Sequence, residues 1–270
     1  MARDLLHRRA HPDRGLSVPG PSWSPPSKVG PLSADKEKGS YVGMSEALTQ
    51  AARNPAVDVA AHIQHTNLRA DATRGDIEQL LAECIEHGFH AAVVNPIWLP
   101  LAVRTLRGFP VRVGTALDFP VGGDTTATVA RAASEARLAG AEEIDVMTKV
   151  GWLKSEMDVA YRQHLAAIVK AADRAPVKAI LEAGILTKHE LALAVELCAD
   201  AGVAYLKNSS GNGGGEATPR LVANLVRLSK GRMRVKASGG ISSLEEAQAL
   251  LEAGADLLGT NSSVAIVGNG

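Results

Sequence analysis

Three stretches near the C-terminus decide the fold: AYLKNSSG at residues 204–211, RVKASGG at 234–240 and DLLGTNSS at 256–263. Each begins with a short apolar run and ends in a turn rich in Gly, Ser or Asn. Such a run followed by such a turn is typical of a buried strand and the loop after it. Three in succession predict a repeated strand–loop–helix order.

The same pattern extends toward the N-terminus. Five further strand-like runs are AHIQHTNL (61–68), HAAVVNP (90–96), VRVGTALDFP (111–120), EEIDVMTK (142–149) and VKAILEAG (177–184). Segments of helical period separate them, often beginning with Thr or Ser and ending in Gly, at 73–88, 125–140, 188–202 and 243–254. Eight strands spaced by about one β-α unit predict an α/β fold, a single-domain (β/α)8 TIM barrel. An open doubly wound sheet is the alternative, although no GxGxxG opens the first unit.

Composition limits the class of protein. Hydrophobic residues make up 46% of the chain and aromatic residues 3%, so the core must consist of Ala, Val, Leu and Ile. Lys plus Arg and Asp plus Glu number 29 each, so no overall field attracts nucleic acid or an anionic membrane. No apolar run approaches the roughly 20 residues of a membrane span. Cys84 and Cys198 show no metal-ligand spacing and are expected to be reduced thiols of a soluble, cytoplasmic protein.

Residues 1–43 differ from the rest of the chain. They are rich in Pro, Arg, Ser and Gly and have no usable periodicity, which predicts a disordered extension. Met44 looks like a second start, so this extension is not expected to belong to the working protein. Residues 44–270 are expected to form the barrel domain.

Four charged residues stand within the strand-like runs: Asp145, Lys178, Lys207 and Lys236; Lys149 lies just beyond the fourth run. A lysine facing packed helices would bury an uncompensated ammonium, so these side chains are expected to point into the barrel. Active sites of such barrels lie at the C-terminal ends of the strands. A purely structural ion-pair network is the alternative reading.

Several lysines around one carboxylate have a specific chemical use. A lysine attacks a carbonyl only as the free amine, and its usual pKa is about 10.4. A second ammonium about 6 Å away, together with desolvation, lowers that pKa enough for imine formation near neutral pH. The pattern alone does not say which lysine is the nucleophile.

Glycine- and serine-rich turns follow the last three strand-like runs. They are Ser209-Ser210-Gly211, then Ser238-Gly239-Gly240, then Thr260-Asn261-Ser262-Ser263. Glycine lets backbone N–H groups approach an anion, and loops after the late strands of these barrels commonly hold phosphate. Tight loops also need glycine for their own geometry, but three consecutive turns favour phosphate binding.

With these residues identified, residues 60–267 resemble the deoxyribose-phosphate aldolase family. The stretches that carry the resemblance are HTNL, EHGFHAAVVNP, EEIDV, LEAGILT, YLKNSSG, VKASGGI and LLGTNSSVAIV. The resemblance implies reversible cleavage of 2-deoxy-D-ribose 5-phosphate to D-glyceraldehyde 3-phosphate and acetaldehyde through a lysine Schiff base. It implies no cofactor and no metal, small phosphorylated sugar and aldehyde partners, and leaves a homodimer open.

The resemblance also assigns roles by matching position. It implies that Lys207 forms the Schiff base, Lys236 lowers the pKa of Lys207, and Asp145 holds Lys236 charged. Lys178 is implied as a supporting charge near the substrate. The implied phosphate-binding set is Ser210, Gly211, Gly239, Gly240, Asn261 and Ser262.

The chain departs from the family pattern at several places. Gln64 stands where the family usually has Asp, and Val93 where Cys is frequent. Asn208, Asn261 and Lys149 also replace more usual residues, so substrate choice is open. The remaining alternatives are a Schiff-base aldolase with another donor or acceptor, and a non-catalytic phosphate-binding barrel.

Overall fold

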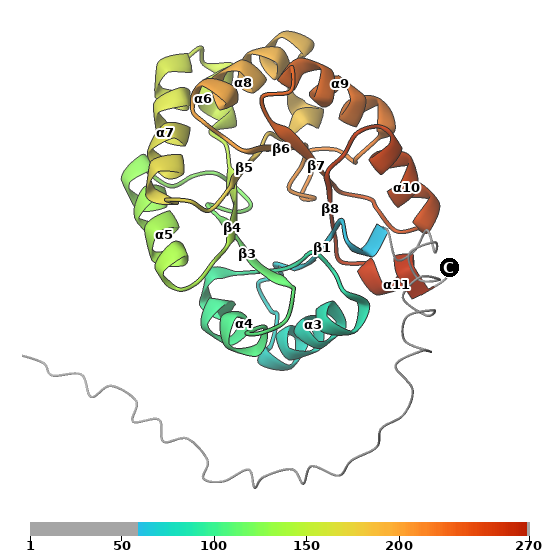
Figure 1. The fold of residues 1–270 in the computed structure, drawn as a ribbon. Coiled ribbons are helices and arrows are strands. Elements are labelled where there is room, and N and C mark those ends of the chain that lie inside the picture. Colours follow the sequence, from blue (N-terminus) through green and yellow to red (C-terminus); the bar gives the residue numbers. More distant parts are fainter. Residues whose placement is uncertain (1–58, 269–270) are drawn as a thin grey trace, which may run out of the picture. The chain divides into compact units, whose positions relative to one another are not determined.

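The structure, a computed structural model, describes residues 59–268 and shows a closed parallel barrel (Figure 1). Each strand pairs with the next, and β8 pairs with β1. The strands are β1 (Ile63–Asn67), β2 (Ala91–Val94), β3 (Arg112–Leu117), β4 (Glu143–Met147), β5 (Val177–Ile180), β6 (Tyr205–Lys207), β7 (Arg234–Ser238) and β8 (Leu257–Thr260). The predicted TIM barrel is confirmed. The predicted extension over residues 1–43 lies outside the described residues and stays a prediction.

The helices form a ring outside the strands, as Figure 1 shows. They are α3 (Arg74–His87), α4 (Leu99–Thr105), α5 (Thr126–Leu138), α6 (Val150–Lys154), α7 (Asp158–Ala171), α8 (Lys188–Asp200), α9 (Pro219–Ser229), α10 (Leu244–Glu252) and α11 (Ser263–Gly268). Two 3-10 turns, η1 (Pro96–Trp98) and η2 (Ala183–Ile185), follow β2 and β5.

The predicted helix caps are present. Thr73, Thr187 and Ser243 each cap a helix, because the side-chain oxygen accepts a hydrogen bond from the backbone N–H three residues later. The acidic side chain of that later residue accepts a hydrogen bond from the backbone N–H of the capping residue. This reciprocal arrangement satisfies backbone N–H groups that the first turn leaves free. Gly88 ends α3 in the left-handed conformation that glycine adopts without strain.

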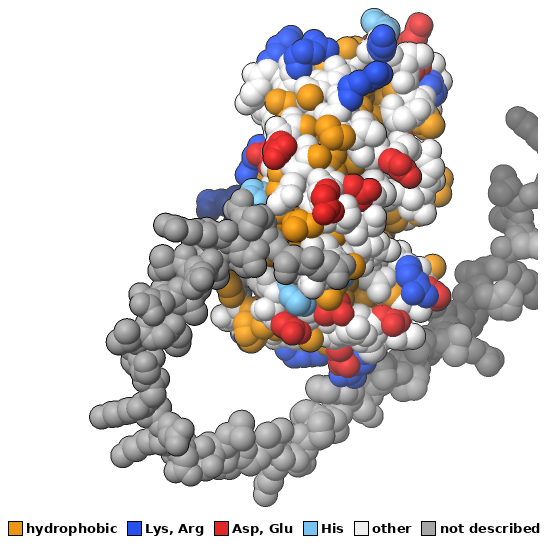
Figure 2. All heavy atoms as spheres, turned by 90° about the vertical axis from the view of Figure 1, so that its right-hand side faces the viewer, with side chains coloured by type: hydrophobic (Ala, Val, Ile, Leu, Met, Phe, Trp, Pro, Cys, Tyr) orange, Lys and Arg blue, Asp and Glu red, His pale blue; other side chains and the backbone are white. Residues whose placement is uncertain are grey.

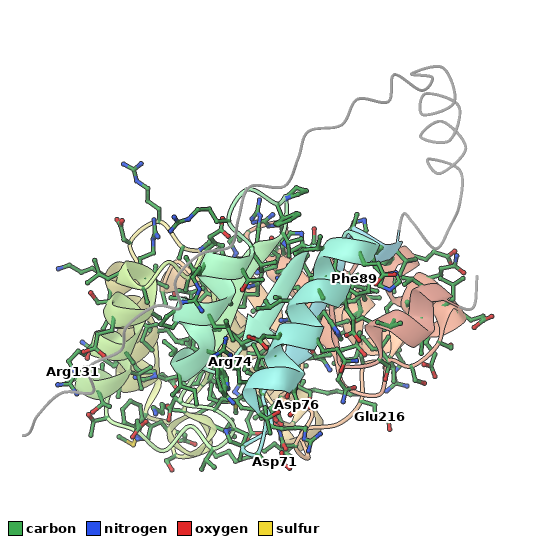
Figure 3. All side chains as sticks on the ribbon, turned by 90° about the horizontal axis from the view of Figure 1, so that it is seen from below. Asp71, Arg74, Asp76, Phe89, Arg131 and Glu216 are labelled. Carbon is green, nitrogen blue, oxygen red and sulfur yellow. The ribbon has the colours of Figure 1, made fainter. Side chains whose placement is uncertain are left out.

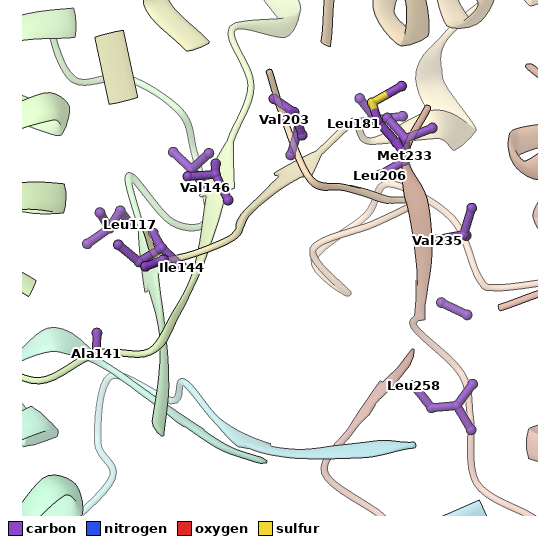
Figure 4. Packing of buried hydrophobic residues seen from close by; sticks show 14 of the residues in the cluster. Leu117, Ala141, Ile144, Val146, Leu181, Val203, Leu206, Met233, Val235 and Leu258 are labelled. Carbon is purple, nitrogen blue, oxygen red and sulfur yellow. The ribbon is translucent and has the colours of Figure 1, made fainter. Parts of the chain in front are cut away.

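The hydrophobic core lies between the strands and the helices. On β4, Ile144 and Val146 belong to this core, whereas the alternate residues Glu143 and Asp145 face the barrel interior. Figure 4 shows the labelled apolar side chains around the ring of strands, not at its centre. Burying one such Val or Ile contributes about 1.5–3 kcal/mol. The apolar shell therefore stabilises the barrel and leaves its interior to polar groups.

The loops that follow the strands gather at one end of the barrel. In Figure 3, Asp71, Asp76 and Glu216, which follow β1 and β6, lie at that end, while Phe89, which precedes β2, lies toward the other. This end is where a site built from strand termini is expected.

One face of the barrel carries charges of both signs. The face in Figure 2 shows Lys and Arg interspersed with Asp and Glu, with apolar side chains scattered among them. Between residues 59 and 268, none of the helices is both long and apolar enough to cross a membrane.

Candidate active site

Four predicted residues meet inside the barrel around one carboxylate. Lys207 Nζ donates to Asp145 Oδ2 at 2.9 Å, and Lys236 Nζ donates to the same oxygen at 2.7 Å. Lys178 Nζ lies 3.2 Å from Asp145 Oδ1. Pairing between neighbouring strands sets this arrangement, because Asp145 lies beside Lys178 and Lys207 beside Lys236. The predicted inward orientation is confirmed for all four.

The charges of this group are unbalanced. Burial acts to raise the pKa of Asp145, but the ammonium groups of Lys236 and Lys207 outweigh it and hold that pKa well below its usual value. Burial lowers the pKa of Lys236 to about 7, repulsion from the other lysines adds to this, and Asp145 opposes it. Near neutral pH the group can therefore release one proton and expose a free amine.

The lowered pKa falls on Lys236, whereas the family resemblance implies a charged Lys236 beside a neutral Lys207. Both ammonium groups contact the same oxygen of Asp145, so the proton that is lost belongs to the coupled pair. Access separates the two lysines. Lys207 lines a cavity that opens to solvent, and Lys236 is fully buried below it.

A second carboxylate, Glu143, lies two residues before Asp145 on β4 and organises a deeper layer. Its oxygens accept from Gln64 Nε2 and from Arg112 at 3.0 Å, pair with His90 at 2.9 Å and lie 2.8 Å from Lys178 Nζ. Burial acts to raise the pKa of Glu143, but His90 and Lys178 hold it well below its usual range. Lys178 thus connects the two carboxylates.

Sequence reasoning missed Glu143, although it shares the alternation of Asp145 along the strand. It identified Gln64 as a departure from the family pattern. In the structure Gln64 donates to Glu143 in the deep layer, and among the described residues no hydrogen bond joins Gln64 to Lys207.

A cavity of about 940 Å³ opens above the charged group at the C-terminal end of the barrel. It collects most of the predicted site residues, namely Lys207, Ser210, Gly211, Gly239, Gly240, Asn261 and Ser262. Asp145, Lys178 and Lys236 are almost completely buried beneath it. A small molecule in this cavity can therefore reach the Lys207 amine and the late loops together.

The loop after β7 has the geometry of an anion-binding turn. Gly239 and Gly240 have φ values of 97° and 76°, which side-chain-bearing residues rarely adopt. A Cβ on Gly239 would lie 3.1 Å from Gly215 O. Within residues 59–268 neither glycine amide donates to a protein acceptor, so both remain free for an anion.

The other two loops are ordered by their own side chains. Ser210 donates its amide to Glu182 Oε1 at 2.6 Å, and Gly211 donates to Ser209 Oγ at 3.0 Å. Ser262 donates its amide to Thr260 Oγ1 at 2.9 Å. These bonds leave the Ser262 hydroxyl and the Asn261 amide group at the wall of the same cavity.

Two residues that were not predicted as site residues, Asn208 and Gly259, shape the surroundings of the Gly239 loop and of Lys236. Asn208 Nδ2 donates to Ser238 O at 2.9 Å, and Asn208 Oδ1 accepts from Ser238 N at 2.7 Å. This double bridge ties the residue after Lys207 to the loop of Gly239. Gly259 on β8 leaves the space that Lys236 occupies, since a Cβ there would lie 2.7 Å from Lys236 Cε.

Residues 59–268 contain no group of three or more His, Cys, Asp or Glu side chains placed to hold a metal ion.

Known proteins resemble this chain over most of its length. It is 45% identical over 207 residues to the deoxyribose-phosphate aldolase of Thermosynechococcus vestitus. The aligned region covers 77% of this chain and 94% of that protein. The deoxyribose-phosphate aldolase of a Geobacillus species is 39% identical over 211 residues, 78% and 95% of the two chains. The tetrameric deoxyribose phosphate aldolase from Aeropyrum pernix superimposes with a TM-score of 0.75 at 31% identity, over 82% of this chain and 95% of that one. No protein-family model matches the chain.

Proposed function

The chain belongs to the deoxyribose-phosphate aldolase family, and from that premise we propose that it cleaves and forms 2-deoxy-D-ribose 5-phosphate through a Schiff base on Lys207. The products of cleavage are D-glyceraldehyde 3-phosphate and acetaldehyde. One observation carries the proposal: Lys207 is the amine of the charged group that lines the cavity, and it shares Asp145 Oδ2 with Lys236.

In the synthetic direction, the free amine of Lys207 adds to the carbonyl carbon of acetaldehyde. Loss of water then gives the iminium, which makes the adjacent methyl group acidic. A base removes one methyl proton, and the resulting enamine carbon forms a bond to the aldehyde carbon of the acceptor. Water hydrolyses the new iminium and restores the amine. Cleavage follows the same steps in reverse.

Asp145 and Lys236 support proton transfer in this scheme. Asp145 accepts hydrogen bonds from both amines, so it stabilises whichever of them carries the proton. Lys236, with a pKa of about 7, can give up or take a proton near neutral pH. A water molecule in the cavity can then relay protons between this pair and the substrate.

The phosphate of the acceptor is proposed to bind at the late loops. The free amides of Gly239 and Gly240 and the hydroxyl of Ser262 supply donors on the wall that Lys207 shares. The proposal also places the protein in the cytoplasm and takes it to be a homodimer. Light scattering of the full chain measures the oligomeric state.

Borohydride reduction tests the mechanism directly. Reduction in the presence of acetaldehyde should add an ethyl group to the chain, and peptide mapping should place it on Lys207. Lys207→Met should lose both the adduct and turnover, by more than about 10⁴-fold, because no other amine reaches the cavity from the group. Lys230→Met, a change at an exposed lysine paired with Glu196, is the matched control and should keep full activity. An adduct on Lys236 or Lys178 would contradict the assignment.

Phosphate recognition has its own measurement. 2-Deoxyribose without phosphate should show a higher KM than the phosphorylated sugar, with less effect on kcat if the loops bind ground and transition states alike. Gly239→Ala should raise KM for the phosphorylated sugar only, since its Cβ displaces the loop. Equal kcat/KM for both sugars would exclude a phosphate site.

A further inference from the structure

Lys149 lies outside the cavity and is held entirely by one loop. Its buried ammonium pairs with the Asp118 carboxylate and donates to Gly122 O at 2.8 Å and Asp124 O at 2.6 Å. All three ammonium hydrogens are therefore used within residues 118–124, the loop between β3 and α5.

The same loop is also bound to itself. Gly122 N donates to Asp118 O at 2.8 Å, and Asp124 N donates to Asp118 Oδ1 at 2.9 Å. Asp118 has a φ of 56°, a left-handed conformation that side-chain-bearing residues rarely adopt. The turn at Asp118 thus depends on these contacts, and Lys149 is their common centre.

Phe119 is the residue that this turn directs to the site. It lines the cavity, and Lys207 Nζ lies over its ring at 5.9 Å from the centroid. A ring at that distance attracts a cationic nitrogen and presents an apolar face beside it. The ammonium and iminium forms of Lys207 both carry the charge that such a ring favours.

We propose that Lys149 is a positioning residue that clamps loop 118–124, so that the Phe119 ring stays beside the Lys207 amine and selects donors without a hydroxyl next to the carbonyl. The proposal rests on the proposed function, because it takes Lys207 to be the imine-forming lysine. Lys149 acts through Phe119 and touches neither donor nor acceptor.

The selection follows from distances and polarity. In an imine directed toward the ring, the imine carbon stands about 1.3 Å from the nitrogen and the methyl carbon about 1.5 Å further, which brings the methyl group to van der Waals distance of the ring. A methyl group gains from that contact. A hydroxyl on the same carbon would be desolvated against a ring face that offers no hydrogen-bond partner. Acetaldehyde should therefore be trapped faster than glycolaldehyde, which carries that hydroxyl.

The test compares borohydride-trapping rates on Lys207 for acetaldehyde and glycolaldehyde in the full chain. The ratio of the two rates is independent of the amount of folded protein, so a loss of stability alone does not change it. Phe119→Ala should lower the ratio by about tenfold, the scale of one unpaired hydroxyl, and Lys149→Met should lower it by a similar factor. The double variant should lower it no further, because both changes remove one effect.

Two further variants make the outcome decisive. Lys154→Met changes a partly exposed lysine of α6 that pairs with Glu190, and it should leave the ratio unchanged. Gly122→Ala keeps the Lys149 ammonium but displaces the loop whose Gly122 carbonyl binds it, because the new Cβ would lie 2.9 Å from Thr148 O. It should lower the ratio even if Lys149→Met fails to fold. Unchanged ratios in Lys149→Met or Gly122→Ala, with an adduct still on Lys207, would overturn the clamp and leave the proposed function intact. No adduct in the unaltered chain would instead overturn the proposed function.

Discussion

Glu143 and Asp145 stand two residues apart on β4, face the same interior and share Lys178, yet their surroundings differ. Glu143 has Gln64, His90, Arg112 and Lys178 around it, and only one of these is a lysine. Asp145 has three lysines and one of them lines the cavity.

Under the proposed function, this difference gives Asp145 a role in the reaction and Glu143 a role in holding the barrel interior together. One positive partner of Glu143 is Arg112, whose half-exposed side chain is also solvated by water. The charges around Glu143 are therefore close to balanced. Around Asp145 three lysines share one carboxylate, and burial, with added repulsion from Lys207 and Lys178, lowers the pKa of Lys236. A proton that is easily lost is what an imine-forming site requires.

Of the changes to this charged group that leave Lys207 in place, Asp145→Asn should have the largest effect. Three ammonium groups would lose their shared counter-charge, so kcat/KM should fall by about 10²–10³-fold. The free energy of unfolding should drop by roughly 3–5 kcal/mol, as for the loss of one partner of a buried pair. Steady-state kinetics and urea unfolding measure the two. Activity within threefold of the unaltered chain would refute the role of Asp145.

Lys236→Met should shift the pH dependence of borohydride trapping. In the unaltered chain trapping should rise with pH through about 7, the pKa of Lys236. Lys236→Met removes a positive charge that repels the protons of the remaining lysines. Those lysines then hold their protons more tightly, so the free amine needed for trapping forms at higher pH. A repulsion of about 2.8 kcal/mol at roughly 6 Å corresponds to about two pH units. A profile that does not move, or moves to lower pH, would contradict this account.

Glu143→Gln should affect activity much less than Asp145→Asn. Lys178 keeps Asp145, so kcat/KM should fall less than about tenfold, while unfolding should become easier by roughly 2–3 kcal/mol. The pKa of Glu143 is below its unfolded value near 4.5, so its contribution is present above that pH and is lost in acid. The stability difference between the variant and the unaltered chain should therefore shrink below about pH 4.5. Larger losses in turnover than in Asp145→Asn would reverse the assignment of the two carboxylates.

Strand periodicity allowed much of this architecture to be predicted. The eight apolar runs correspond to the eight strands, and charged residues within buried runs had to face the interior, which located Asp145, Lys178, Lys207 and Lys236. Gly-rich turns after the last strands located the cavity wall. Both inferences use local pattern alone, which a single sequence displays.

The remainder depends on partners distant in sequence. Nothing local shows that Gln64 meets Glu143, that Asn208 bridges to Ser238, or that Lys149 is enclosed by loop 118–124. Nor could the pattern divide one proton between Lys207 and Lys236, because that depends on burial and on a shared oxygen. Barrel closure creates each of these relations.

The bridge between Asn208 and Ser238 gives the site a fixed span. Asn208 follows Lys207 directly, and Ser238 precedes Gly239, so the two hydrogen bonds hold the amine and the anion-binding turn as one rigid piece. A substrate that bonds covalently at one end and anchors its phosphate at the other must match that span. Under the proposed function, the site would act as a molecular ruler that selects a sugar phosphate by the number of carbons between its carbonyl and its phosphate.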